Sequence, residues 1–162
     1  MEKKMTWEGI GPKLFLITLP YIILAVILIR LNPEFLKMNF IGKRVGNISG
    51  YILLLAGLIF YASTAIVFFK EFNKGKLITT GTYSLCRNPI YATFIVFIIP
   101  SLALLFQSGM IVTIDLVLYL NFKVSIHGEY KVLKEQFGIE YEKYEHSVNE
   151  IIPLPKIWKK SK

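Results

Sequence analysis

Two polar stretches of this chain carry the residue types that could bind a charged ligand. The first covers residues 77–91 and contains Arg87, Asn88 and Pro89. Arg87 offers a planar set of donors that matches a carboxylate or a phosphate. Pro89 favours the first position of a helix, and the free N–H groups at such a helix start attract anions. We therefore expect an anionic group of a ligand to bind beside Arg87 and Asn88.

The second polar stretch covers residues 127–144 and supplies a carboxylate and aromatic rings. Glu129 could accept hydrogen bonds from ribose hydroxyls or pair with an ammonium group. Aromatic faces attract cations by roughly 0.5–2 kcal/mol each, and the two stretches offer such faces at Tyr83, Tyr91, Tyr141 and Tyr144. These groups suit a ligand that has a carboxylate, an amine, a ribose and a positive centre. Tyr141 and Tyr144 could equally anchor their segment at lipid headgroups.

The composition is that of a small membrane protein with several spans. Of the 162 residues, 54% are hydrophobic and 19% are charged, and the mean hydropathy is +0.51. A bilayer core is crossed by about 20 apolar residues in a helix. We expect one all-α integral membrane domain over residues 1–162, with about four transmembrane helices at residues 14–31, 48–69, 89–106 and 110–126.

The connections between the last runs predict how the polar stretches are brought together. The short turn at residues 107–109 makes the third and fourth runs an antiparallel helical hairpin. The C-terminal segment 127–155 has apolar residues at gaps of four and three, the pattern of one helical face. We expect this amphipathic segment to close over a cofactor pocket at the cytoplasmic face.

The positive charges predict the orientation in the membrane, because cytoplasmic loops carry an excess of Lys and Arg. With four spans and a cytoplasmic N-terminus, Lys3, Lys4, the basic loop 70–88 and the C-terminal segment all lie inside. Both termini and both polar stretches are then cytoplasmic. The basic residues also meet anionic membrane lipids, which we expect as partners.

Several other classes of partner fit the sequence poorly. The net charge is +8, but the basic residues flank apolar runs instead of alternating with exposed aromatics, so no nucleic acid is expected. With two histidines and one cysteine, no metal site is expected. Cys86 lies beside Arg87, which could lower the pKa of its thiol. The alternative, which we favour, is a small residue in a tight segment.

Five motifs stand in a fixed order along the chain. Leu-Ile-Thr-Thr-Gly-Thr-Tyr occupies residues 77–83 and Arg-Asn-Pro-Ile-Tyr occupies 87–91. Glu-Tyr-Lys-Val-Leu at 129–133, Phe-Gly-Ile-Glu-Tyr at 137–141, and Tyr144 with Ile152 and Pro153 follow. This combination resembles the isoprenylcysteine carboxyl methyltransferase family, which is related to the phospholipid N-methyltransferases. The resemblance covers about residues 75–155.

The resemblance implies an integral membrane enzyme that transfers a methyl group from S-adenosylmethionine to a lipophilic acceptor from the bilayer. S-adenosylmethionine has all four groups that the polar stretches suit. Arg87 would be the catalytic residue, at the junction of cofactor and substrate. The cofactor contacts would fall on Lys76, Leu77, Ile78, Tyr83, Asn88, Pro89, Ile90, Tyr91 and Glu129.

The sequence departs from the family where the acceptor would bind. Eukaryotic members have a substrate-binding arginine four residues before the position of Glu129, and this chain has Ser125 there. Lys123 and His127 are nearby cations that could replace the arginine. Asp115 is a carboxylate within an apolar run, where an ionisable residue indicates function or a helix contact. We therefore retain Asp115, Lys123 and His127 as candidate substrate residues.

Two alternatives to a methyltransferase with a prenylcysteine acceptor remain open. Methyl transfer is an in-line displacement at an activated carbon, so it depends mainly on positioning and needs no His–Asp pair. The first alternative is a phospholipid, amine or thiol methyltransferase of the same fold. The second is a non-catalytic membrane protein that binds lipid or a partner, which would show no cofactor turnover.

Overall fold

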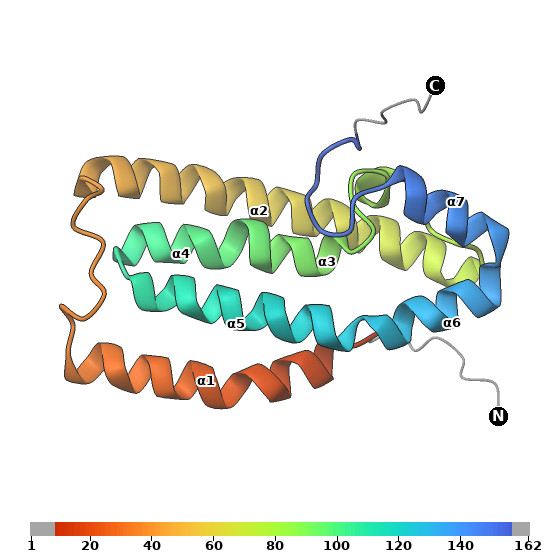
Figure 1. The fold of residues 1–162 in the computed structure, drawn as a ribbon. Coiled ribbons are helices and arrows are strands. Elements are labelled where there is room, and N and C mark those ends of the chain that lie inside the picture. The colour runs from red at the N-terminus through yellow and green to blue at the C-terminus, as the bar shows by residue number, and fades with distance from the viewer. Residues whose placement is uncertain (1–8, 157–162) are drawn as a thin grey trace, which may run out of the picture.

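The computed structural model describes residues 9–156, and this part of the chain is helical, with only isolated backbone bridges in place of strands (Figure 1). Lys3 and Lys4, which contribute to the expected orientation, lie outside the described residues. The long helices are α1 (Gly11–Leu31), α2 (Lys43–Glu71) and α5 (Gly109–Ser125). The shorter elements are η1 (Phe72–Lys74), η2 (Gly81–Ser84), α3 (Pro89–Ala92), η3 (Thr93–Ile98), α4 (Ile99–Phe106), α6 (His127–Phe137) and α7 (Ile139–Ser147).

The described helices confirm an all-α fold with three or four candidate membrane spans. Three segments are long and apolar enough to cross a bilayer: Gly11–Leu31, Lys43–Lys74 and Pro89–Phe106. A fourth passes only if α5 and α6, which are bent by 40° at their junction, count as one broken span. The 17 residues of α5 rise by about 25 Å at 1.5 Å per residue. The expected run at 110–126 is therefore short of the bilayer core of about 30 Å.

Spatial order differs from chain order. The helices lie side by side in one row: α2, the α3–η3–α4 rod, α5 and then α1 (Figure 1). The rod contains one π-helical segment, η3, before Pro100. Gln107 has a left-handed backbone angle φ of 48° and ends α4, so that α5 turns back beside it. This is the hairpin that the short turn predicts.

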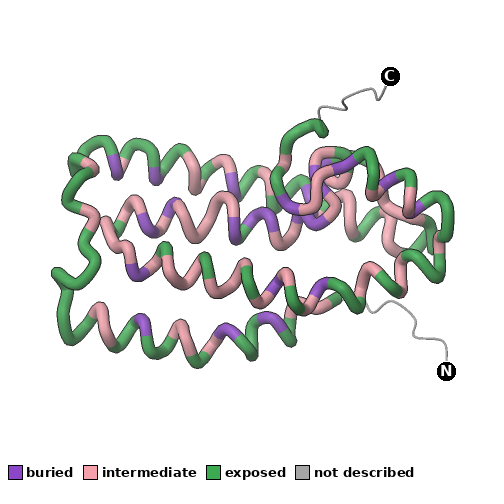
Figure 2. Tube along the Cα trace, viewed as in Figure 1, coloured by how far each residue is buried: buried purple, intermediate pink, exposed green. Residues whose placement is uncertain are grey.

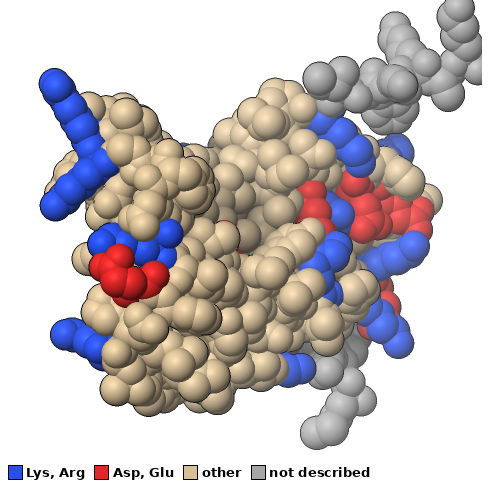
Figure 3. Space-filling view, turned by 60° about the vertical axis from the view of Figure 1, so that its left-hand side comes forward, with Lys and Arg blue, Asp and Glu red and all other residues tan. Residues whose placement is uncertain are grey.

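Small residues hold the row together while large apolar residues face outward. An added Cβ at Gly57 would lie 2.7 Å from Phe97 Cβ, and one at Gly50 would lie 2.7 Å from Leu105. Such close backbone approach is how helices associate in lipid. Large apolar side chains of α1 and α2 remain exposed (Figure 2), including Leu16, Ile23, Leu24, Ile52, Leu55 and Ile66. Charged side chains leave an apolar band between them (Figure 3), as a lipid-facing surface requires.

One end of the row brings the two polar stretches together. There α6 continues from α5 beyond the row, and α7 turns back toward the end of α2 (Figure 1). The backbone N–H of Arg87 donates to the carbonyl of Asn149 (2.8 Å), and that of Asn88 donates to the carbonyl of Glu150 (3.1 Å). The C-terminal segment is therefore docked on the motif that precedes α3.

Candidate functional site

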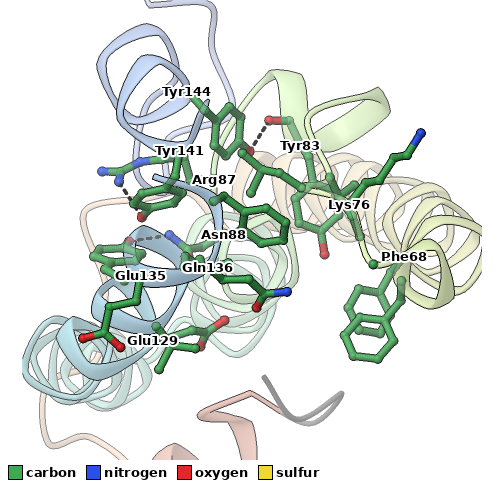
Figure 4. Close-up of a pocket in the computed structure, with 18 residues that line it drawn as sticks. Phe68, Lys76, Tyr83, Arg87, Asn88, Glu129, Glu135, Gln136, Tyr141 and Tyr144 are labelled. Carbon is green, nitrogen blue, oxygen red and sulfur yellow. Dashed lines mark hydrogen bonds between the residues drawn. The ribbon is translucent and has the colours of Figure 1, made fainter. Parts of the chain in front are cut away.

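A cavity of about 550 Å³ lies between the end of α2, the loop before α3, and helices α6 and α7 (Figure 4). This volume falls within the usual range for small-molecule sites. Seven of the ten residues that the motifs assign to catalysis or cofactor binding line it: Lys76, Leu77, Ile78, Tyr83, Arg87, Asn88 and Glu129. The cavity therefore gathers residues from three separate parts of the sequence.

The loop before α3 is fixed on both sides. Gly81 has a φ of +60°, and an added Cβ there would lie 2.7 Å from Val67 of α2. The hydroxyl of Thr64 donates to the Thr82 hydroxyl at 2.9 Å, which ties the loop to α2. On the other side the Tyr144 hydroxyl donates to the Tyr83 carbonyl at 2.6 Å. The loop is thus held between α2 and α7, which fixes the cavity residues it carries.

Arg87 is held in a cage of acidic and aromatic groups. Its side chain is 11% exposed, and Nη1 donates to Glu145 Oε1 at 2.6 Å and to the Tyr141 hydroxyl at 3.3 Å. The guanidinium carbon lies 4.8 Å from the centre of the Tyr130 ring, within cation–π range. Its Nε atom is buried and has no hydrogen-bond partner in the described part of the chain. The Arg87 guanidinium is therefore held in place through Nη1, while the N–H of Nε is not used.

Asn88 links the cavity to the C-terminal segment. It is 7% exposed, and Nδ2 donates to the Tyr130 hydroxyl (2.6 Å) and to the Glu150 carbonyl (3.0 Å). The Tyr130 hydroxyl in turn donates to Glu150 Oε1 at 3.2 Å. Asn88 can make these hydrogen bonds at any pH, because a side-chain amide does not titrate.

Glu129 presents a carboxylate to the cavity (Figure 4). Its Oε2 atom is buried and has no hydrogen-bond partner among residues 9–156. Buried polar atoms in folded proteins are nearly always partnered, so an orphaned carboxylate oxygen indicates a missing donor. A ligand that supplies a hydroxyl or an ammonium would satisfy it.

The sequence reasoning missed the apolar wall of the cavity. Phe68 lies near the end of α2 and Phe72 begins η1, with ring centres 4.8 Å apart. Leu133 and Phe137 face the cavity from α6. The i, i+4 spacing of each pair predicts a shared helical face, but it cannot say what that face meets. Tyr130, which supports both Arg87 and Asn88, was also missed.

Three of the predicted cofactor contacts lie behind the cavity wall. Pro89 begins α3 and is fully buried, and neither it nor Ile90 lines the cavity. Tyr91 packs on Phe122 with ring centres 5.2 Å apart, and its hydroxyl accepts from the Ile10 amide at 3.2 Å. These residues form the support of the site.

Cys86 is a structural residue in this fold. Its side chain is fully buried, and its backbone pairs with Asn149. Burial raises the pKa of the Cys86 thiol to about 12, so the idea that Arg87 lowers it is wrong. Within residues 9–156 no group of three or more His, Cys, Asp and Glu residues is arranged to hold a metal ion.

Comparison with known proteins finds two curated relatives. Both carry the name probable protein-S-isoprenylcysteine O-methyltransferase, one from Oryza sativa subsp. indica and one from subsp. japonica. Each is 35% identical to this chain over 79 residues, which is 49% of the chain and 41% of the relative. The resemblance to the isoprenylcysteine carboxyl methyltransferase family is confirmed. No family model matches the chain, and no solved structure matches it.

The three candidate substrate residues lie apart from the cavity. Lys123 Nζ is paired with Glu150 Oε2 at 2.7 Å, and His127 is exposed at the start of α6. Asp115 lies within α5, where its Oδ1 atom is buried with no partner among the described residues. None of the three lines the cavity. A role in binding substrate stays a prediction for each.

Proposed function

We propose that this chain is an S-adenosylmethionine-dependent methyltransferase that acts on a lipophilic acceptor at the membrane. The observation that carries the proposal is a pair of buried polar atoms with no hydrogen-bond partner in the described part of the chain, Glu129 Oε2 and Arg87 Nε, on two residues that line one cavity at the end of the helix row. One atom is an acceptor and the other a donor. The names of the rice relatives support the proposal, although the match spans only 41% of their length.

The donor and acceptor set fits the proposed cofactor. The Glu129 carboxylate would accept from the ribose hydroxyls or the ammonium group, and Arg87 would donate to the carboxylate. The rings that line the cavity, Tyr83 and Tyr141 among them, would face the positive sulfur. The apolar wall at Phe68 and Phe72 would cover the adenine. When bound, the cofactor supplies an electrophilic methyl group.

The residues of this chain would position the reacting groups and exclude water from them. Arg87 is locked by Glu145 and Tyr141, so a group bound to its free side is held at one angle. Aromatic and aliphatic side chains from α2 and α6 line the other wall and would exclude water from a bound ligand. Alignment of nucleophile, methyl carbon and leaving sulfur is the main requirement of such a displacement. No residue need act as a base for a carboxylate or thiolate acceptor, whereas an amine must lose a proton.

The acceptor is proposed to be a prenylcysteine carboxylate or, alternatively, a phospholipid, another amine or a thiol. The experiment is an assay of the purified protein with radiolabelled methyl donor, offered prenylcysteine analogues and membrane lipid extracts separately. A labelled prenylcysteine ester with no labelled lipid would remove the phospholipid alternative. Labelled lipid alone would remove the carboxylate. No labelled product from either, with cofactor bound, would favour a non-catalytic binding protein.

We further propose that both termini and the cavity face the cytoplasm, on the charge distribution of the loops. Gly42 and Glu140 are exposed at opposite ends of the helix row, and the native Cys86 is fully buried. In spheroplasts or sealed vesicles, Gly42→Cys should react with an impermeant maleimide only from outside. Glu140→Cys should react only from the cytoplasmic side. Reaction of both from the same side would contradict this topology.

A further inference from the structure

The chain just before α1 runs directly against the support of the site. The backbone N–H of Ile10 donates to the Tyr91 hydroxyl at 3.2 Å, across 81 positions of sequence. The first N–H groups of a helix lack intrahelical partners, so Tyr91 satisfies one that would otherwise be free. The faint red ribbon at the bottom of Figure 4 is this end of the chain, and it passes beside Glu129.

Gly9 allows this close approach. Its φ of +55° lies in the left-handed region that favours glycine. An added Cβ would lie 3.1 Å from the Tyr91 hydroxyl oxygen, 3.3 Å from Glu129 Oε2 and 3.6 Å from Glu129 Oε1. The first two distances are shorter than ordinary van der Waals contact, so any larger residue would require one of these groups to move.

The Glu129 carboxylate is the group that would move. Tyr91 is fixed by its packing on Phe122, which is fully buried. Ile10 and Tyr91 pack against the same cluster of buried residues. Glu129 Oε2 has no hydrogen-bond partner in the described structure, whereas the Tyr91 hydroxyl accepts a hydrogen bond from the Ile10 amide.

We propose that Gly9 and Ile10 form a positioning strap that holds the Glu129 carboxylate toward the cavity. The strap is anchored through Tyr91, and its glycine lies beside the carboxylate, where an added Cβ would come within 3.6 Å of both oxygens. This inference rests on the proposed function, in which Glu129 binds the ribose or amine of the cofactor. It adds the two residues just before α1 to a site whose predicted cofactor contacts all lie within residues 76–129.

The first test compares Gly9→Ala with Gly11→Ala in the full chain. Gly11 is the matched control, because an added Cβ there meets no atom within 4 Å. In titrations with S-adenosylmethionine, Gly9→Ala should weaken binding at least tenfold and Gly11→Ala less than twofold. Gly9→Asn should weaken binding as Gly9→Ala does, because asparagine tolerates the left-handed backbone but still adds a Cβ. Wild-type affinity in either Gly9 variant would overturn the strap.

The second test does not depend on the cofactor. A lipophilic carbodiimide labels the carboxyl groups of the cofactor-free protein, and mass spectrometry follows Glu129, with Asp115 as the internal reference. Gly9→Ala should raise the rate at Glu129 at least threefold relative to Asp115, while Gly11→Ala should leave the ratio unchanged. If Gly9→Ala does not fold, Tyr91→Phe removes the acceptor of the Ile10 amide without adding atoms, and it should raise the ratio too.

The two tests separate the strap from the proposed function. If the wild-type protein binds no S-adenosylmethionine, the proposed function fails and the labelling ratio still decides the strap. An unchanged Glu129-to-Asp115 ratio in folded Gly9→Ala, or in Tyr91→Phe, would overturn the inference.

Discussion

Glu129→Gln should weaken the binding of S-adenosylmethionine at least tenfold, a loss of about 1.4 kcal/mol or more. Glutamine keeps the shape of the side chain but removes the negative charge, and charge-assisted hydrogen bonds are about twice as strong as neutral ones. The effect should be large because the Glu129 Oε2 atom is buried and has no partner within residues 9–156. Calorimetric titration of the detergent-purified variant measures it.

Glu135→Gln is the matched control for this change. Glu135 lies on the same helix and lines the same cavity, but its side chain is 64% exposed and its only ion-pair contact in the described structure is a 4.0 Å approach to Lys131. Solvent screens such a charge, so its removal should change affinity less than twofold. Equal weakening by the two variants would show that only the net negative charge of the cavity affects binding. That result would contradict a specific role for Glu129.

Arg87→Met should abolish measurable methyl transfer and lower the free energy of unfolding by about 2–3 kcal/mol, which is less than the roughly 3–5 kcal/mol that breaking a fully buried ion pair costs. The variant loses the contacts to Glu145 and Tyr141 and the cation–π contact to Tyr130. The cost is limited because the Glu145 side chain is 37% exposed and can regain water. Thermal unfolding in detergent and a turnover assay measure the two effects.

Two further variants separate the roles of Arg87. Lys134→Met breaks an ion pair between two exposed side chains, Lys134 and Glu142, and should leave the thermal unfolding of the protein unchanged, because solvent screens such a pair. Glu145→Gln leaves an oxygen that can still accept from Arg87 Nη1, so it should cost about 1 kcal/mol and retain most of the turnover. An Arg87→Met protein that turns over normally would show that Arg87 is only a surface-anchoring cation.

Much of the fold follows from local patterns in the sequence. The apolar runs at 14–31, 48–69 and 89–106 fall within the three candidate spans, because the length and polarity of a span are read directly from composition. The hairpin is also a local feature, because a turn as short as residues 107–109 leaves the two flanking helices antiparallel and adjacent. The fourth run, residues 110–126, meets the criteria for a span only together with α6. The chain bends by 40° between α5 and α6, and no proline or glycine run in the sequence marks that bend.

The candidate site was predictable only where motifs carried it. The gathering of Arg87, Asn88 and Glu129 at one cavity fits the expectation that two polar stretches close over a ligand. The pairing of Arg87 with Glu145, and of Lys123 with Glu150, depends on how α7 and the segment after it dock, which no local pattern encodes. The aromatic wall of α2 and the approach of Gly9 were missed because both contacts join parts of the chain that are far apart in sequence.

The central claim is that the cavity binds S-adenosylmethionine. The most direct measurement is a calorimetric titration of the folded wild-type protein, purified in detergent, with S-adenosylmethionine. The account predicts saturable binding at one site per chain, with the Glu135→Gln protein binding like the wild type and the Glu129→Gln protein at least tenfold more weakly. No saturable heat from a well-folded wild-type protein would contradict the account and leave the lipid-binding alternative.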